Sequence, residues 1–171
     1  SSTIPAVMAD KTRAARESGR RAVELAQKEL KPSDILEKTA FLNAITVDLA
    51  IGGSTNAVLH LLALAREVGV SLTMGDFDAV SRKVSCICAV RPNGPFNMVD
   101  LHEAGGVPAI QKILEGVLET SAIGVSGIRL AEILAQVPFQ PNEVIRTLED
   151  PVHQDCGLAI LQGNLAPDGA I

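Results

Sequence analysis

Two adjacent glycines interrupt an apolar region in the stretch IGGSTNAVLHLLALA, residues 51–65. Glycine adopts backbone conformations that other residues avoid, so the pair permits a tight turn with exposed N–H groups. Apolar segments on both sides predict two buried helices, over 31–51 and 57–68, joined by this turn. Ser54, Thr55 or Asn56 can cap the second helix, and Ser33 is the expected cap of the first.

The remaining pattern predicts mostly short helices and a few strands. We expect a helix over 6–30 with an apolar stripe, and further helices over 72–84, 98–106, 107–116 and 128–137. Pro108 should occupy the first position of its helix. The run CICAV, residues 86–90, is a strand candidate. From Pro138 onward, prolines and short β-type runs increase, which predicts an α/β domain over 1–141 and a β-rich domain that begins at 142 and continues to 171.

Composition excludes several classes of function. The chain has 171 residues, 47% of them apolar, but no Trp or Tyr and only four Phe, so its core must be aliphatic. A net charge of −5 argues against nucleic-acid binding. The basic stretch over 10–31 is either the solvated face of a helix or a phosphate or partner patch. No apolar run is long enough to cross a membrane, and no signal peptide is visible. Three cysteines without framework spacing predict free thiols in a cytoplasmic protein.

The turn over 52–56 has two open interpretations. It is a capped turn between two core helices, or it lines a pocket for an acidic small molecule, because a helix N-terminus favours an anion. It is not a nucleotide loop, since no Lys follows the glycines. His60, one helical turn after Asn56, is expected to be a buried histidine with a hydrogen-bond partner.

Two further groups invite a catalytic or metal-binding interpretation. Asp100, His102 and Glu103 occur together, but their helical spacing makes a shared metal awkward, so a structural or pocket-wall role is favoured. Cys86 and Cys88 would face one side of a strand, yet two thiols are too few for a zinc or iron–sulfur site, and all three cysteines are expected to be ordinary thiols. Residue chemistry alone names no reaction.

Three long stretches resemble the dihydroxy-acid dehydratase family, which includes phosphogluconate and sugar-acid dehydratases. They are AFLNAITVDLAIGGSTNAVLHLLALAREVGVSLTMGDFDAVSRKV, then DLHEAGGVPAI, then GLAILQGNLAPDGAI. The resemblance implies removal of water from a 2,3-dihydroxy carboxylic acid to give a 2-keto acid, with an iron–sulfur cluster and Mg²⁺ as cofactors and a homodimer as the assembly. The stretches VSGIRLAEIL and EVIRTLEDPVHQDCGLAIL resemble the branched-chain amino-acid enzyme most, with sugar-acid dehydratases as the alternative.

The resemblance also implies an incomplete enzyme. The family's cluster cysteines and its Cys-Asp-Lys magnesium motif are absent, and Cys156 stands where the family has Gly, so we expect no catalytic or metal-binding residue here. The chain would be the mostly helical remainder of an N-terminal α/β domain plus the first strands of a β-barrel-like domain, inactive alone. Ser54, Thr55 and Asn56, on a buried helix start, are the expected substrate-carboxylate or pocket contacts, with His102 as a weaker one. Two other interpretations stay open: a non-catalytic helical interaction module and a stand-alone binder of small acids.

Overall fold

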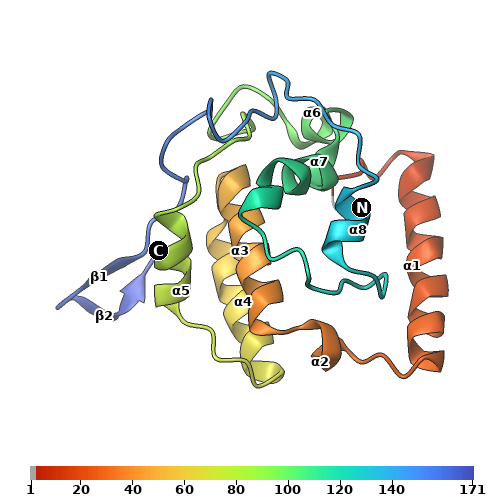
Figure 1. The fold of residues 1–171 in the computed structure, drawn as a ribbon. Coiled ribbons are helices and arrows are strands. Elements are labelled where there is room, and N and C mark those ends of the chain that lie inside the picture. Colours follow the sequence, from red (N-terminus) through yellow and green to blue (C-terminus); the bar gives the residue numbers. More distant parts are fainter. Residues whose placement is uncertain (1–2) are drawn as a thin grey trace.

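The structure, a computed structural model, describes residues 3–171 and is mostly helical (Figure 1). Its helices and strands follow in this order: α1 Ala9–Gln27, α2 Pro32–Ile35, α3 Lys38–Ile51, α4 Thr55–Glu67, α5 Met74–Ser81, α6 Met98–Glu103, α7 Gly106–Ile113, the 3₁₀ turn η1 Leu114–Gly116, α8 Leu130–Leu134, β1 Leu161–Gly163 and β2 Ala166–Ala170. The two strands form one antiparallel hairpin at the C-terminal end of the chain. Helical content and C-terminal strands were both expected; a barrel is not part of what the structure describes within residues 3–171.

Helix α3 is the centre of the molecule, and α4, α5 and α7 pack around it (Figure 1). It has almost no polar face, because apolar residues occupy nearly every side. Ile45 and Leu49 join one core cluster with Val58 of α4 and Phe77 of α5. On another side, Ala50 joins a second cluster with residues of α6, α7 and the segment 84–90. Because α3 is buried on both sides, most of its positions favour apolar residues.

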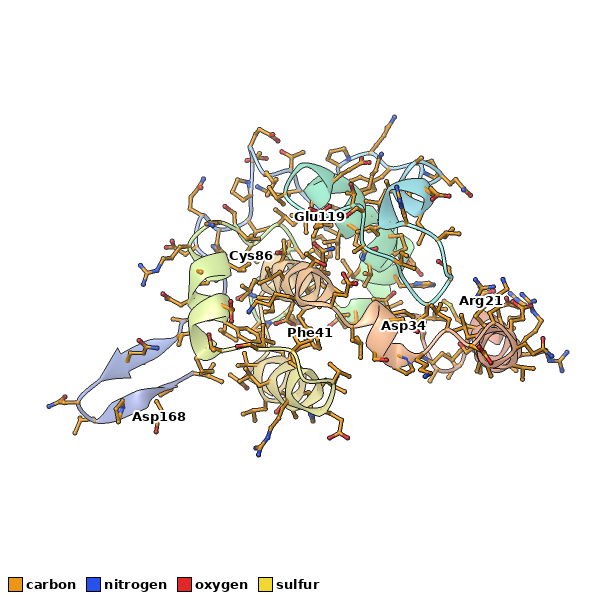
Figure 2. All side chains as sticks on the ribbon, turned by 60° about the horizontal axis from the view of Figure 1, so that its bottom comes forward. Arg21, Asp34, Phe41, Cys86, Glu119 and Asp168 are labelled. Atoms are coloured by element: carbon orange, nitrogen blue, oxygen red, sulfur yellow. The ribbon has the colours of Figure 1, made fainter. Side chains whose placement is uncertain are left out.

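Helix α1 and the hairpin lie at opposite ends of the molecule (Figures 1 and 2). Phe41 of α3 points into the interior, whereas Asp168 stands on the outlying hairpin (Figure 2). No residue of α1 is buried, and Val23 is 58% exposed, so the expected apolar stripe adds no buried side chain to the core that the structure describes. Arg21 ties α1 to the rest through a hydrogen bond from Nε to the Val125 carbonyl oxygen, at 3.2 Å.

Several expected elements need correction. The region 31–51 contains two helices, because the backbone leaves the helical conformation at Leu36, and the N-cap is Lys31 with Pro32 at the first position rather than Ser33. Pro108 is the third residue of α7, after Gly106 and Val107.

The segment 86–90 makes only isolated bridges and is not a strand. Its backbone N–H groups donate hydrogen bonds to carbonyl oxygens of different segments: Cys86 to His153, Ile87 to Ala50, and Ala89 to Val144. No single neighbour runs beside it long enough to build a ladder.

Candidate functional site

The turn between α3 and α4 requires both of its glycines. Gly52 and Gly53 have φ values of +133° and +78°, a region that L side chains rarely adopt. A Cβ on Gly52 would overlap the side-chain amide of Asn93, and one on Gly53 would lie 2.7 Å from Leu158 Cβ. The turn ends α3 with a hydrogen bond from the Gly53 N–H to the Asp48 carbonyl oxygen, at 2.8 Å. The chain therefore reverses here in a conformation that only glycine accommodates.

Ser54, Thr55 and Asn56 lie on the surface, at the start of α4. All three are exposed, so the expected buried helix start is wrong for these side chains, although Gly52 beside them is buried. Ser54 is the N-cap, as expected, but its side chain makes no capping hydrogen bond. Its backbone N–H instead donates to Asp48 Oδ2 at 3.1 Å. The hydroxyl and amide groups of these residues thus remain available to a partner outside the described residues.

Helix α4 also presents apolar side chains to solvent. Only Val58 and Ala65 are buried, and Leu59 and Leu64 are 61% and 48% exposed. His60 is exposed, which contradicts the expectation of a buried histidine. The sequence pattern suggested burial on nearly all sides, but among residues 3–171 α4 packs chiefly against α3. Leu59 stands one turn after Thr55 and so on the same exposed face.

His102 lies elsewhere, on α6. It is half-buried, and its Nδ1 is 3.4 Å from the hydroxyl oxygen of buried Thr3. Asp100 caps its own helix, accepting the Asn97 N–H at 2.6 Å. Within residues 3–171, no hydrogen bond or shared cavity connects His102 with the start of α4. The structure therefore keeps Ser54, Thr55 and Asn56 together and leaves His102 apart from them.

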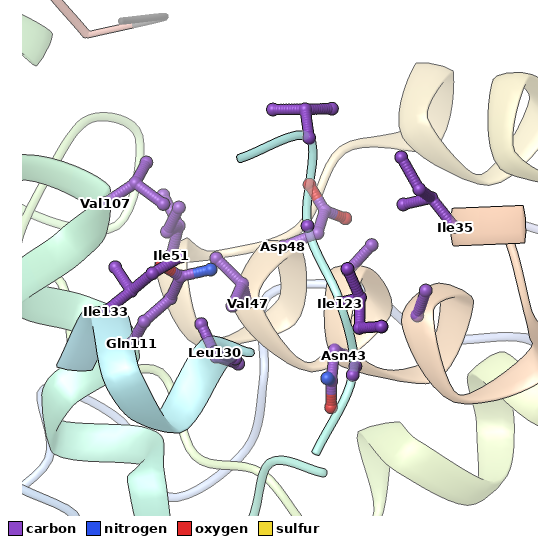
Figure 3. Close-up of a pocket in the computed structure, with 15 residues that line it drawn as sticks. Ile35, Asn43, Val47, Asp48, Ile51, Val107, Gln111, Ile123, Leu130 and Ile133 are labelled. Atoms are coloured by element: carbon purple, nitrogen blue, oxygen red, sulfur yellow. The ribbon is translucent and has the colours of Figure 1, made fainter. Parts of the chain in front are cut away.

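A cavity of about 490 Å³ lies beside α3 (Figure 3). Its walls come from α2, α3, α7, α8 and the segment 122–125. Most lining side chains are aliphatic: Ile35, Ala40, Ala44, Val47, Ile51, Val107, Ala122, Ile123, Val125, Leu130 and Ile133. Three polar side chains join them, Asn43, Asp48 and Gln111, of which only Asp48 is charged. Size and lining are those of a small-molecule pocket, which is typically apolar with a few polar groups.

Asp48 belongs both to this cavity and to the glycine turn, a role that the sequence pattern did not indicate. Burial raises the pKa of its carboxyl group, while the hydrogen bond from the Ser54 N–H acts in the opposite direction. The available signal was a single acidic residue inside a largely apolar helix. A carboxylate in this wall opposes the entry of an acid into the cavity.

The cysteines do not form a cluster site. Cys86 and Cys88 are buried, as expected, and Cys156 is half-buried. Burial raises the pKa of Cys86 and raises that of Cys88 to about 12, which disfavours the thiolates that metal binding needs. No group of three or more His, Cys, Asp or Glu side chains suited to a metal ion occurs within residues 3–171. The described residues therefore fit neither an iron–sulfur cluster nor Mg²⁺.

None of the helices formed by residues 3–171 combines the length and apolar character that crossing a membrane requires.

Comparison with known proteins gives consistent matches. Residues 1–133 match the family described as dihydroxy-acid/6-phosphogluconate dehydratase N-terminal. A dihydroxy-acid dehydratase of Microcystis aeruginosa is 48% identical over 176 aligned positions, covering 100% of this chain and 31% of that protein. The Synechocystis enzyme of the same name is 45% identical with the same coverage. That of Methanococcus maripaludis strain C7 is 45% identical over 170 positions, 99% of this chain. The chain thus spans about a third of the length of these relatives.

Proposed function

Because this chain belongs to the dihydroxy-acid/6-phosphogluconate dehydratase family, we propose that the protein containing it removes water from a 2,3-dihydroxy carboxylic acid to give a 2-keto acid. The observation that carries the proposal is 45–48% identity, over essentially the whole chain, to proteins named dihydroxy-acid dehydratase. A hydro-lyase of this kind must hold the acid's carboxylate and assist departure of a hydroxyl group. The described residues supply means for the first task only.

The start of α4 is our candidate for holding the carboxylate. Ser54, Thr55 and Asn56 are exposed side by side, and the N-terminus of a 13-residue helix carries partial positive charge. The hydrogen bond to Asp48 holds the Ser54 backbone in place, so the side-chain donors of Ser54, Thr55 and Asn56 are positioned before a ligand binds. His102 is a weaker candidate, because no hydrogen bond or cavity among residues 3–171 connects it with the start of α4.

The iron–sulfur cluster and Mg²⁺ of the proposed enzyme would be held by residues outside this chain. Such a cluster supplies a Lewis acid for the leaving hydroxyl group when it is bound. The described side chains hold no suitable donor set, so their part is to support the fold and line the substrate site. We expect the chain alone to be inactive.

The preferred substrate is a branched-chain 2,3-dihydroxy acid, and a sugar acid is the second candidate. The relatives reported above carry the name dihydroxy-acid dehydratase, which favours the first, whereas the matching family also names 6-phosphogluconate dehydratase. We further propose a cytoplasmic homodimer, an α/β domain through residue 141, and a β-barrel-like domain that begins at residue 142 and includes the hairpin of β1 and β2.

The test is an assay of the full-length protein, purified without oxygen and supplied with iron, sulfide and Mg²⁺. We expect a branched-chain 2,3-dihydroxy acid to yield its 2-keto acid faster than an aldonic acid does. Absence of 2-keto acid from every dihydroxy acid would overturn the proposal and favour a non-catalytic interaction module.

Variants then test the start of α4. Thr55→Ala and Asn56→Ala should raise KM about tenfold or more, since a hydrogen bond to a charged group contributes about 1.5–3 kcal/mol. The matched control is Thr12→Ala, because Thr12 is exposed on α1, which buries no residue. An unchanged KM in both α4 variants would remove these residues from the substrate site.

A further inference from the structure

The cavity beside α3 has the size of a ligand site, and the carboxylate of Asp48 in its wall disfavours an acid there. Its volume of about 490 Å³ lies within the range of roughly 300–1,000 Å³ usual for small-molecule pockets. Eleven aliphatic side chains line it, and the part of the chain that the structure describes contributes no basic side chain to the lining. A ligand there must therefore be largely hydrocarbon and must not bring an unpaired negative charge.

The polar groups of the wall define what else the ligand must carry. Both polar atoms of the Asn43 side chain already have a partner: Nδ2 donates to the Glu119 carbonyl oxygen at 2.9 Å, and Oδ1 accepts the Glu119 N–H at 2.8 Å. Asp48 uses only Oδ2, for the Ser54 N–H. Its Oδ1 has no further partner among residues 3–171, and neither does the side chain of Gln111, on the α7 wall (Figure 3). The open positions are thus a carboxylate oxygen and an amide.

We propose that this cavity binds a small branched alkylammonium ion, with its ammonium group on Asp48 and its hydrocarbon body among the aliphatic side chains. An ammonium group has three donors, one of which suits Asp48 Oδ1, and Gln111 offers a second polar group elsewhere on the lining. The pairing also compensates a carboxylate that is otherwise half-desolvated in an apolar wall. A carboxylic acid of the same shape would place two negative charges together and meet no cation on the lining.

The test uses 3-methylbutylammonium and the full-length protein. Calorimetry should show saturable binding of one ion per chain, and ¹³C-methyl spectra should shift at Ile35, Val47 and Ile123. The neutral 3-methylbutanol should bind at least tenfold more weakly, and the anionic 3-methylbutanoate should not bind. Absence of saturable amine binding, or tighter binding of the acid than of the amine, would overturn the proposal.

Three variants separate the site from general cation binding. Asp48→Asn keeps an acceptor for Ser54 but removes the charge, and should weaken amine binding at least tenfold. Asp34→Asn is the matched control, because Asp34 also accepts a backbone N–H, from Lys31, but lies outside the cavity lining. Ala44→Leu, which fills the cavity from an exposed position, should abolish binding. Thermal unfolding confirms that each variant is folded. Equal affinity in the wild type and Asp48→Asn would contradict the assignment.

These results are independent of the dehydratase assay. Amine binding that depends on Asp48 supports the cavity assignment even if no dihydroxy acid is converted. Conversely, an active dehydratase whose affinity for the amine does not change in Asp48→Asn retains its proposed function and loses this second site.

Discussion

The carboxylate of Asp48 accepts the backbone N–H of Ser54 at 3.1 Å, which joins the last turn of α3 to the first residue before α4. The same side chain forms part of the wall of the apolar cavity beside α3. One residue thus connects the cavity with the glycine turn. Any change at Asp48 is therefore expected to affect both features.

Replacement of Asp48 should lower the free energy of unfolding, because it removes the link between α3 and the start of α4. Asp48→Ala removes the acceptor and should lower the free energy of unfolding by about 1–2 kcal/mol, since hydrogen bonds to charged groups contribute at least that much. Asp48→Asn keeps an acceptor and should cost less. Urea unfolding measures both, and equal losses in the two variants would show that the hydrogen bond is not the cause.

The pH dependence of Asp48 has a defined sign. Because burial raises its pKa above the ordinary 3.8, the folded state binds the proton more tightly than the unfolded state does. The wild type should therefore gain stability relative to Asp48→Asn as pH falls from neutrality through the raised pKa towards 3.8. A constant difference across that window would contradict the raised pKa.

Asp76 should show the opposite behaviour. Although burial acts to raise its pKa, the hydrogen bonds from Lys38 and Thr73 prevail and lower it below the ordinary 3.8. Its Oδ2 accepts the Thr73 N–H at 2.8 Å and so caps α5, while Oδ1 pairs with Lys38 Nζ at 2.7 Å. Asp76→Asn should cost about 1–2 kcal/mol at neutral pH, as lost caps do, and the loss should shrink as pH falls below 3.8 through the lowered pKa.

The control for Asp76 lies on the same helix. Asp78 pairs with exposed Arg82. Exposed pairs contribute at most about 1 kcal/mol, so Asp78→Asn should change the free energy of unfolding less than Asp76→Asn does. Chemical denaturation across the pH range distinguishes the two; a larger loss for Asp78→Asn would refute the assigned roles.

Gly157 should not tolerate a methyl group. A Cβ there would overlap the carbonyl oxygen of Gly52, whereas a Cβ on Gly163 meets nothing within 4 Å. Gly157→Ala should lower stability by about 2–3 kcal/mol, as overpacking does, and Gly163→Ala should change it by less than about 0.5 kcal/mol. Thermal unfolding compares the pair. If the two variants melt alike, the close approach of Gly157 to the turn is wrong.

The thiols should differ sharply in reactivity. Cys86 and Cys88 are buried, and burial raises the pKa of each, to about 12 for Cys88. A thiol-alkylating reagent should therefore modify only half-buried Cys156 in the native protein and all three cysteines after denaturation. Mass spectrometry counts the adducts. Cys156→Ser is the control, and rapid native modification of this variant would contradict the burial of the other two.

The proposed division of labour predicts a negative result for the 171-residue chain alone. Supplied with iron, sulfide and Mg²⁺ under reducing conditions, it should develop no cluster absorbance and release no 2-keto acid, because its described side chains hold no donor set for either metal centre. Stoichiometric cluster binding by this chain would place ligands among its own residues. The full-length protein under the same conditions is the positive control.

Local signals predicted most of the helices. The helices α1, α4 and α5 were identified within a few residues, because apolar spacing is a signal that each segment carries by itself. The strand prediction for 86–90 was wrong because the backbone partners of this segment come from three distant parts of the chain, which no local pattern encodes. The prediction that α4 is buried was wrong for a related reason. Apolar residues predict burial, but they do not say which protein surface covers them.

The candidate site was predictable only in part. The glycines of the turn were identified because their conformational role is local. Asp48 was not, since its significance comes from α7 and α8 closing a cavity around it. His102 was grouped with the turn residues by resemblance, and the described contacts leave it with Thr3 instead.

Within residues 3–171, no further strand pairs with the hairpin of β1 and β2, so both of its sides are open. With only two strands, and with Leu161 and Leu165 62% and 95% exposed, it gains little from its own pairing, and isolated hairpins are marginal in water. Each side offers free N–H and C=O groups to any extended segment. In a longer polypeptide, additional strands can pair with these sides. In a solution of the 171-residue chain, the same groups can pair with the hairpin of another copy, which leads to aggregation.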